Sequence, residues 1–164
     1  MIKYRRIEKE EKEKEKVKTL INEVLGNIER KEFFIPYKEK DYEDMFNRKK
    51  YIIYGAYDGE KLVGTGCLKL DVKEEVKDYL DIGSEKVLKF SKYLVLEEYR
   101  NQGIMKTLEY ELMREAKLLN YEYGVITVHP ENEASKKVIK HLGAELVKTI
   151  YIDEYLREIY LVKL

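Results

Sequence analysis

The sequence centres on one segment, Tyr93-Leu-Val-Leu-Glu-Glu-Tyr-Arg-Asn-Gln-Gly-Ile-Met-Lys106. This segment predicts a short apolar strand, then a loop that carries Arg100, Gln102 and Gly103, and then an amphipathic helix. A loop of this kind points unpaired backbone N–H groups, and the positive end of a helix dipole, at the space in front of it. The arrangement is typical of sites that hold a phosphate group.

Strand and helix patterns alternate along the rest of the chain. Apolar residues three and four apart predict helices, and β-rich runs bounded by turn residues predict strands. In chain order these are a strand at 2–7, a helix through residue 28, a short helix at 41–48, strands at 51–57 and 61–70 joined by Asp58-Gly59, a weak helix within 71–84, a strand at 87–96, a helix from 105, a strand at 124–128, a helix at 132–142 and an antiparallel pair at 144–152 and 155–162. Without repeats or breaks in composition, the pattern predicts one α/β domain over residues 1–164.

Two stretches allow more than one interpretation. The Glu/Lys run at residues 8–16 predicts either an interaction tail or, in preference, the exposed first turns of a helix held by opposite charges three and four apart. The aromatic loop at residues 33–37 could line a substrate pocket or only pack against the core. Cys67 lies within a predicted strand and is interpreted as a small core residue rather than a nucleophile.

The composition reduces the number of functional classes to which the protein could belong. Lys plus Arg and Asp plus Glu each number 32, so the formal net charge is zero, whereas nucleic-acid binders usually carry a basic excess. One cysteine excludes a disulfide within the chain, and two histidines are too few to predict a zinc site. The N-terminal residues turn charged before an apolar segment develops, so neither a signal peptide nor a membrane span is predicted. We expect a cytoplasmic protein without nucleic-acid, metal or membrane partners.

Three kinds of phosphate loop compete for the segment around Gly103. A Walker A loop requires Gly-Lys-Ser/Thr at the start of the helix, and a dinucleotide loop requires three spaced glycines. Neither of these patterns is present in the segment. The third kind is the R/Q-x-x-G-x-G/A loop of acyl-CoA transferases. Arg100 and Gly103 match its first two fixed positions, and Met105 stands where Gly or Ala is usual.

Two linked segments, residues 95–108 and 127–143, resemble the GNAT superfamily of acyl-CoA-dependent N-acyltransferases. In the second segment Asn132 begins a helix and Gly143 ends it. With a similar hairpin at residues 54–66, the resemblance covers residue 51 to the C-terminus. It implies an α/β (α+β) fold, a single GNAT-like domain in which a mixed, mostly antiparallel sheet is flanked by helices. Its strands at 89–96 and 124–128 should be parallel and splay apart.

The resemblance also implies how acetyl-CoA binds. The pantetheine arm would enter the gap between the two parallel strands, and main-chain N–H groups of the loop would hold the pyrophosphate. Gly103 would allow close approach of the backbone, and Met105 would be tolerated if it pointed away. Asn132 is a helix N-cap in either case, and a contact to the cofactor would be an added role. The implied binding residues are Leu94, Val95, Arg100, Asn101, Gln102, Gly103, Ile104, Met105, Lys106, Asn132 and Ser135.

Acetyl transfer requires a neutral amine, a donor for the oxyanion and a proton for the leaving thiolate. A backbone N–H near Val95 is the candidate oxyanion donor. The family's usual carboxylate base falls at Thr127, and His129 shares that strand face, so His129 is either the base or only a partly exposed histidine at the strand end. The family's thiolate-protonating tyrosine falls at Ile139, so Tyr93 or Tyr151 would have to replace it.

The predicted function is therefore an N-acetyltransferase. It would transfer the acetyl group of acetyl-CoA to a primary amine of a small molecule or peptide, by direct attack in a ternary complex. The predicted catalytic residues are His129, Val95 and Tyr93, and a homodimer is a possible assembly. The alternative is a non-catalytic acyl-CoA-binding sensor, or an interaction module, on the same fold.

Overall fold

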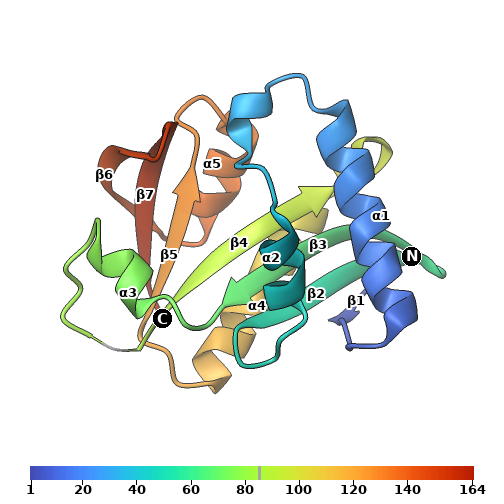
Figure 1. Ribbon diagram of the computed structural model, residues 1–164, viewed down its shortest axis with the longest axis horizontal. Helices are drawn as coiled ribbons and strands as arrows, with labels where there is room; N and C mark the ends of the chain where they lie inside the picture. Colours follow the sequence, from blue (N-terminus) through green and yellow to red (C-terminus); the bar gives the residue numbers. More distant parts are fainter. Residues whose placement is uncertain (85) are drawn as a thin grey trace.

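The computed structural model describes residues 1–84 and 86–164 (Figure 1). Within these residues the strands form one seven-stranded sheet in the order β1-β2-β3-β4-β5-β7-β6. The strands are β1 (Ile2–Arg6), β2 (Tyr51–Asp58), β3 (Lys61–Lys69), β4 (Val87–Val95), β5 (Tyr123–Val128), β6 (Glu145–Ile152) and β7 (Tyr155–Lys163). Among the strands of the described residues, β4 and β5 alone pair in parallel. The mixed, mostly antiparallel sheet predicted from the sequence is confirmed.

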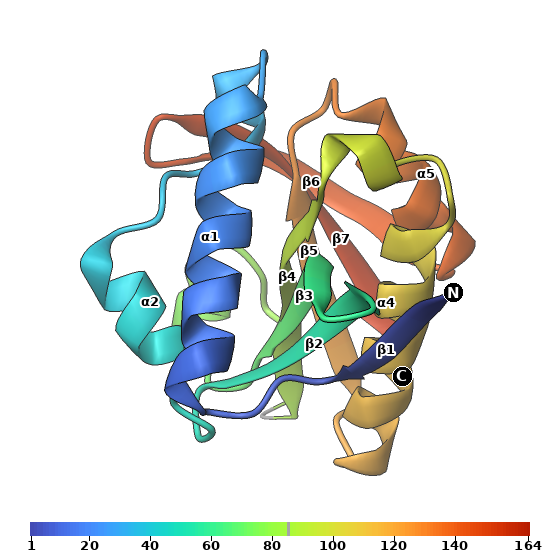
Figure 2. The same ribbon diagram turned by 90° about the vertical axis from the view of Figure 1, so that its right-hand side faces the viewer.

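Helices cover both faces of this sheet, as Figure 2 shows, with α1 and α2 on one side and α4 and α5 on the other. The helices are α1 (Glu11–Asn27), α2 (Glu39–Met45), α3 (Lys73–Lys77), α4 (Ile104–Leu118) and α5 (Glu133–His141), with short 3-10 turns at Lys31–Phe33 and Glu97–Tyr99. The apolar stripe of α1 buries Val17 and Leu20 against the sheet, and that of α4 buries Leu108 and Leu112. These buried stripes hold the three layers together.

The central strands β4 and β5 part soon after they begin. Their parallel pairing covers only Val87–Lys89 and Tyr123–Val125, and beyond it the strands diverge (Figure 1). The pairing of β4 with β3 also shifts register, because Thr65 faces Leu94 while Cys67 faces Ser91. The extra residue on β4 is accommodated as a bulge in which Lys92 has φ 57°. The bulge bends β4 where the gap opens, as the predicted splay requires.

The predicted turns and caps are present. Gly59 has φ 59° in the β2–β3 hairpin, and Gly143 has φ 80° after α5. Left-handed backbone of this kind favours glycine. At the other end of α5 the Asn132 side chain accepts a hydrogen bond from the Ser135 N–H at 3.3 Å. The N-cap role of Asn132 is confirmed.

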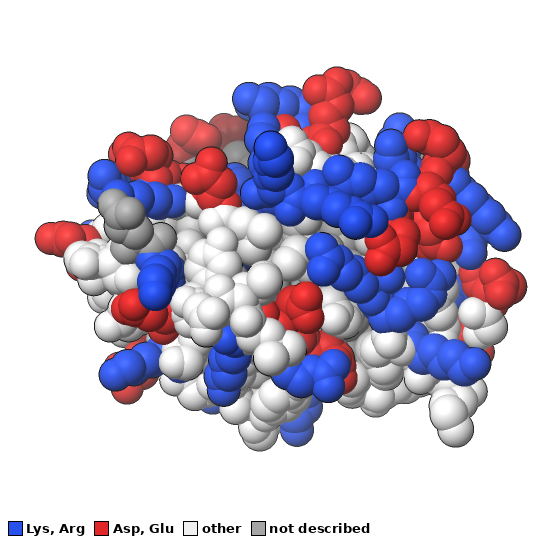
Figure 3. All heavy atoms as spheres, turned by 90° about the horizontal axis from the view of Figure 1, so that it is seen from below, with Lys and Arg blue, Asp and Glu red and all other residues white. Residues whose placement is uncertain are grey.

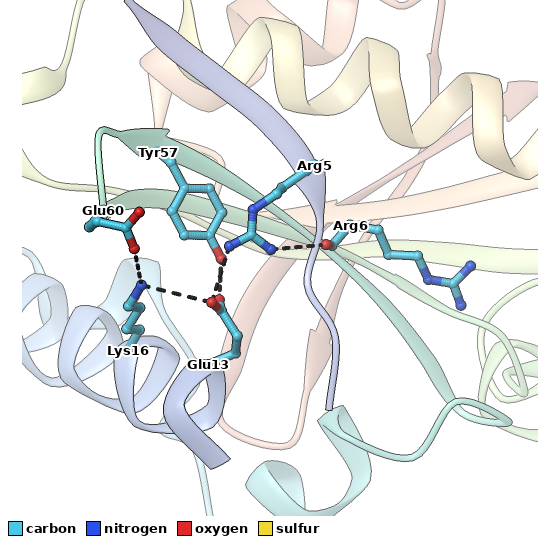
Figure 4. A network of polar contacts seen from close by, with 6 residues as sticks. All are labelled: Arg5, Arg6, Glu13, Lys16, Tyr57 and Glu60. Atoms are coloured by element: carbon cyan, nitrogen blue, oxygen red, sulfur yellow. Dashed lines mark hydrogen bonds and ion pairs between the residues drawn. The ribbon is translucent and has the colours of Figure 1, made fainter. Parts of the chain in front are cut away.

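The Glu/Lys run forms the start of α1, which confirms the helical interpretation. Lys14 pairs with Glu11 on the exposed surface, as expected. Glu13, however, is only 7% exposed. It accepts hydrogen bonds from Tyr57 of β2 and from Arg5 of β1 (Figure 4). One carboxylate of the run therefore anchors the helix to the sheet.

Charge is spread over the surface. Both signs occur on the face shown in Figure 3, in keeping with the formal net charge of zero. Across residues 1–84 and 86–164, no helix is long and apolar enough to cross a bilayer. Cys67 is fully buried, and burial raises the pKa of its thiol to about 12. Its interpretation as a core residue is confirmed.

Candidate active site

A cavity of about 270 Å³ opens where β4 and β5 part. Because its lining comes from both faces of the sheet, the cavity passes through the gap between the two strands. On the α4 and α5 side it is lined by Phe90, Tyr93, Met105, Glu109, Ile126, Val128, Asn132, Ser135 and Ile139. On the α2 and α3 side it is lined by Phe33, Phe34, Ile35, Pro36, Tyr37, Asp41, Tyr51, Lys69, Glu75, Lys89, Ser91, Lys92, Thr127 and Arg157. The aromatic loop at residues 33–37 thus lines a pocket.

The loop before α4 presents backbone N–H groups beside this cavity. Gly103 is the N-cap, with φ 76°, and no side chain of the described residues caps the helix. The side chains of the loop turn back onto its own carbonyl groups, since Arg100 Nε donates to Val95 O at 3.3 Å and Gln102 Nε2 to Glu98 O at 3.4 Å. The first N–H groups of α4 therefore have no hydrogen-bond partner among the described residues, and at this end of the helix the dipole favours an anion.

The structure brings most of the predicted cofactor residues to this region. Leu94 and Val95 pair with β3, and in the described part of the chain the other edge of β4 has no strand partner beyond Lys89. An extended chain could hydrogen-bond to that edge. Asn101, Ile104 and Lys106 lie in or directly after the loop, and Asn132 and Ser135 line the cavity from α5.

The sequence interpretation required the Met105 side chain to point away from the site if it was to be tolerated there. In the structure it does not point away. Its side chain is partly buried and lines the cavity from the first turn of α4. The reason is helical geometry. Met105 lies on the sheet-facing side of α4, four residues before Glu109 and seven before Leu112. A cofactor arm in the gap would contact the Met105 side chain.

His129 lies at the end of β5, 8% exposed and outside the cavity lining. Its Nδ1 accepts a hydrogen bond from the Glu131 N–H at 3.1 Å, and its ring lies 5.0 Å from that of Phe33. A neutral imidazole that accepts at Nδ1 carries its proton on Nε2, so neither nitrogen is free to take a proton. The geometry favours the alternative of a strand-end histidine, although a buried one. The role of His129 as the base remains a prediction that the geometry disfavours.

Three buried polar atoms in the cavity wall have no hydrogen-bond partner among the described residues. They are Ser91 Oγ, Tyr93 OH and Glu109 Oε2. An unsatisfied buried polar atom costs about 1–3 kcal/mol, so the presence of three such atoms, Ser91 on the α2 and α3 side and Tyr93 and Glu109 on the α4 and α5 side, indicates that the cavity is built for polar ligand groups. Tyr93 lines the cavity, and its catalytic role stays a prediction, whereas Tyr151 is 69% exposed on β6 and does not line the cavity.

Glu109 is a site residue that sequence analysis missed. It is 2% exposed, and burial raises the pKa of its carboxyl group to about 8. The carboxyl group is therefore largely protonated at neutral pH. The sequence did contain an indication of its place, because Glu109 interrupts the apolar stripe Met105, Leu112 and Ala116 of α4. A carboxyl group in a buried stripe needs a partner or a function.

The opposite wall of the cavity is rich in cations. Lys69 and Lys89 both pair with Glu75, at 2.8 and 3.1 Å, and so share one carboxylate. Lys92 lies 3.9 Å from the centre of the Tyr37 ring. Arg157 of β7 completes this wall and is 3% exposed. Strand alternation could have found Arg157, since it shares a face with Ile159, which is fully buried.

The residues of the cavity fit acetyl-CoA and offer no metal site. No group of three or more His, Cys, Asp or Glu side chains that could hold a metal occurs in residues 1–84 and 86–164. An unpaired strand edge for an amide-bearing arm, an uncapped helix N-terminus for a pyrophosphate, and unpartnered polar atoms between them match the groups that the cofactor carries.

Comparison with known proteins agrees with this geometry. Residues 22–144 match the Acetyltransferase (GNAT) family, and the chain belongs to it. As a member of this family, the protein is an acyltransferase that uses acetyl-CoA. A sequence search of curated proteins gave no significant match.

Solved structures show the same fold. Arabidopsis thaliana NAA60 in complex with acetyl-CoA superimposes with a TM-score of 0.77 and 18% identity, covering 100% of both chains. A GNAT-family acetyltransferase from Streptococcus pneumoniae gives a TM-score of 0.77 at 15% identity, again over 100% of both chains. The ribosomal-protein-S18-alanine N-acetyltransferase from Escherichia coli gives 0.73 at 12% identity, covering 99% of this chain and 94% of that one.

Proposed function

We propose that this protein is an N-acetyltransferase, which moves the acetyl group from acetyl-CoA to a primary amine in a ternary complex. The observation that carries the proposal is the cavity that passes through the gap between β4 and β5. A passage through the sheet allows the donor to enter from the α4 side and the acceptor from the α2 side, so that the two meet without a covalent enzyme intermediate. Cys67, the one cysteine of the chain, is buried with a raised pKa and unsuited to form one.

In the proposed reaction a bond forms between the amine nitrogen and the acetyl carbon, and the bond from that carbon to sulfur breaks. The amine must first lose a proton. Lys69, Lys89 and Arg157 lie in the wall on the acceptor side, and nearby positive charge lowers the pKa of a bound ammonium group. The proton then passes to water at the open end of the cavity, and no dedicated base is required. A backbone N–H near Val95 remains our candidate donor to the oxyanion.

We propose that Glu109 supplies the proton that the leaving thiolate takes up. The family's tyrosine for this role falls at Ile139, whose side chain has no proton to donate. A thiol has a pKa of about 8.5, and the raised pKa of Glu109, about 8, is close to it. A donor matched in this way transfers its proton readily. Tyr93 beside it is the weaker acid, because burial raises the pKa of its hydroxyl well above the usual range. Tyr93, whose hydroxyl has no partner among the described residues, is better suited to orient the thioester.

Two measurements test the proposed function. Isothermal titration with acetyl-CoA should show binding at micromolar to low millimolar concentration, and no heat at millimolar ligand would contradict the proposal. Release of CoA thiol should then depend on an added primary amine. Tight binding without amine-dependent release across a broad panel would favour the non-catalytic sensor instead. The E. coli relative is named as an N-acetyltransferase of an alanine, which supports including peptide amines in the panel.

The assembly and location of the protein are part of the same proposal. We infer a cytoplasmic enzyme, and a homodimer as one possible assembly. Sedimentation at micromolar protein concentration tests the dimer, with a mass near twice 19.7 kDa as the supporting result.

A further inference from the structure

Arg157 is an unusual residue for the wall of a cavity. Its guanidinium is buried, and within the described residues its one hydrogen bond from a side-chain nitrogen is to the carbonyl oxygen of Leu156, at 2.7 Å. Among the described residues it forms no salt bridge with a carboxylate. Arg157 interacts electrostatically with Tyr155, whose ring lies 5.6 Å away, and with Lys89, which carries a charge of the same sign.

The groups around Arg157 do not neutralise it. Glu75 is already shared between Lys69 and Lys89, so this trio carries one net positive charge. Lys92 lies against the rings of Tyr37 and Tyr51 and forms no ion pair within the described part of the chain. The other acidic group on this wall is Asp41, whose Oδ2 accepts a hydrogen bond from the Lys38 N–H at 2.7 Å. The wall thus has a surplus of positive charge.

A buried charge without a counter-ion is costly, and proteins normally pair it. The guanidinium is also the side-chain group best shaped to bind a carboxylate, through two parallel N–H···O bonds. Only one of its donors is used here, and the group lies in the wall of the cavity. The missing counter-ion is therefore most simply part of the substrate.

We propose that the acceptor amine carries a carboxylate, and that Arg157 binds this carboxylate on the acceptor side of the cavity. Lys92, at the bulge of β4, is placed to add a second positive charge. This inference rests on the proposed N-acetyltransferase function and names the chemical class of its acceptor as an amino acid or another amine of similar size that bears an acidic group. The narrow cavity, about 270 Å³, favours an acceptor of this size.

Matched pairs of acceptors test the proposal. Each pair consists of an amino acid and its amide, such as glycine and glycinamide or 4-aminobutyrate and 4-aminobutyramide. Loss of the carboxylate also lowers the pKa of the amine, so KM is compared as the concentration of neutral amine. We expect the acid of at least one pair to have a KM about 10-fold or more below that of its amide, the range of one charge-assisted hydrogen bond. O-Phosphoethanolamine, an amine with a phosphate, shows whether the subsite takes a different oxyanion, and a preference for it over both acids would overturn the assignment to carboxylate.

Variants of Arg157 test whether this side chain causes the preference for the acid over the amide. Arg157→Met should remove the preference for the acid while leaving acetyl-CoA binding unchanged, and Arg157→Lys should restore part of it. Lys163→Met is the control, since Lys163 lies on the same strand but is exposed and outside the cavity. A preference that survives in Arg157→Met would contradict the proposal. If Arg157→Met does not fold, Arg157→Lys alone decides the matter, through a smaller but measurable loss of the preference.

Calorimetry separates this inference from the proposed function. The acid and amide of each pair are titrated into protein saturated with CoA, where no transfer can occur. Tighter binding of an acid than of its amide supports the carboxylate subsite even if no amine is ever acetylated. The absence of acetylation would count only against the proposed acetyltransferase function. Equal or absent binding of acids and amides overturns the subsite, and amine-dependent thiol release would then still support the acetyltransferase function.

Discussion

Glu109 shows how much the chemistry of a single residue depends on its place in the fold. Exposed on a helix it would be an ordinary carboxylate, but burial in the cavity wall raises its pKa to about 8. If Glu109 donates the proton to the thiolate, kcat falls as the pH rises through about 8. Glu109→Gln should lower kcat by about 10²-fold or more and remove this limb of the profile.

The same residue makes a second prediction, about stability. The folded protein holds the Glu109 proton up to about pH 8, whereas the unfolded chain loses it near pH 4.5, the ordinary value. Folding therefore takes up a proton between these values, and the stability due to this group is lost as the pH rises through them. Thermal unfolding of Glu109→Gln should depend less on pH than that of the wild type, with a gain in stability on the order of 5 kcal/mol at pH 9, because the two pKa values differ by about 3.5 and each pKa unit is worth about 1.4 kcal/mol.

A carboxylate on the same helix supplies the control. Glu111 pairs with Arg114 outside the cavity, so Glu111→Gln should change neither the kcat profile nor the pH dependence of unfolding. A Glu109→Gln protein that behaves like Glu111→Gln in both assays would show that Glu109 is ionised at neutral pH and takes no part in transfer.

His129 should affect stability rather than turnover. His129→Ala removes the acceptor of the Glu131 N–H and the contact with Phe33, which should cost about 1–3 kcal/mol. His129→Asn, whose side-chain oxygen can still accept from that N–H, should cost less. Both variants should keep the pH profile of kcat. Loss of one limb of the profile in both variants would instead assign the base to His129.

At the scale of the element, the N-terminus of α4 is the feature on which cofactor binding depends. Gly103 has φ 76° and open space where a Cβ would lie. Gly83, which also has positive φ and open space, lies outside the cavity and is the matched control. Alanine at either position should lower stability by about 1–2 kcal/mol because of the strained φ. Only Gly103→Ala should weaken acetyl-CoA binding, by about 10-fold or more, as measured by calorimetry. Equal affinity in the two variants would contradict the proposed pyrophosphate site.

The start of α1 is attached to the sheet by the hydrogen bonds that the buried Glu13 carboxylate accepts. Burial raises the pKa of this group, but the hydrogen bonds from Tyr57 and Arg5 outweigh burial and lower the pKa below 4.5. Glu13→Gln should therefore destabilise the protein at pH 7 by about 1–3 kcal/mol, and the difference from the wild type should shrink as the pH falls below 4.5. Glu11→Gln, which removes only an exposed pair, should change stability by less than about 1 kcal/mol. Equal effects of the two changes in chemical denaturation would show that the network contributes nothing.

Most elements could be predicted because their signals are local. The spacing of Leu108, Leu112 and Ala116 marks α4, and Asp58-Gly59 marks the hairpin. The buried role of Glu13 could not be predicted in this way. Its partners Arg5 and Tyr57 come from β1 and β2, and only the packed fold brings the three together.

The site was predictable on the donor side and not on the acceptor side. The loop at Gly103 and the cap at Asn132 are continuous sequence features, so their places followed from spacing. Glu109, Lys92 and Arg157 come from three separate elements and form one cavity only because β4 and β5 diverge. Strand alternation made His129 a candidate base, because alternation predicts the face of a residue but not the hydrogen bond that its ring accepts.

At the scale of the whole molecule, the divergence of two central strands opens the sheet, and the proposed reaction uses one of its faces as the donor side and the other as the acceptor side. The donor side has the N-terminus of α4 and the neutral, buried Glu109, and the acceptor side has the aromatic loop and the cationic wall. The sheet that separates them is opened by the bulge at Lys92 and by the short pairing of β4 with β5. Both proposals, for the reaction and for the acceptor, depend on this one passage.

A crystal structure of the protein with CoA bound tests this account most directly. We predict that the pantetheine arm lies between β4 and β5, beside Met105 and Glu109, with the pyrophosphate on the backbone N–H groups at the start of α4. The thiol should end within reach of Glu109, facing the wall that contains Arg157. CoA bound elsewhere, with the gap between the strands filled by side chains, would contradict the account.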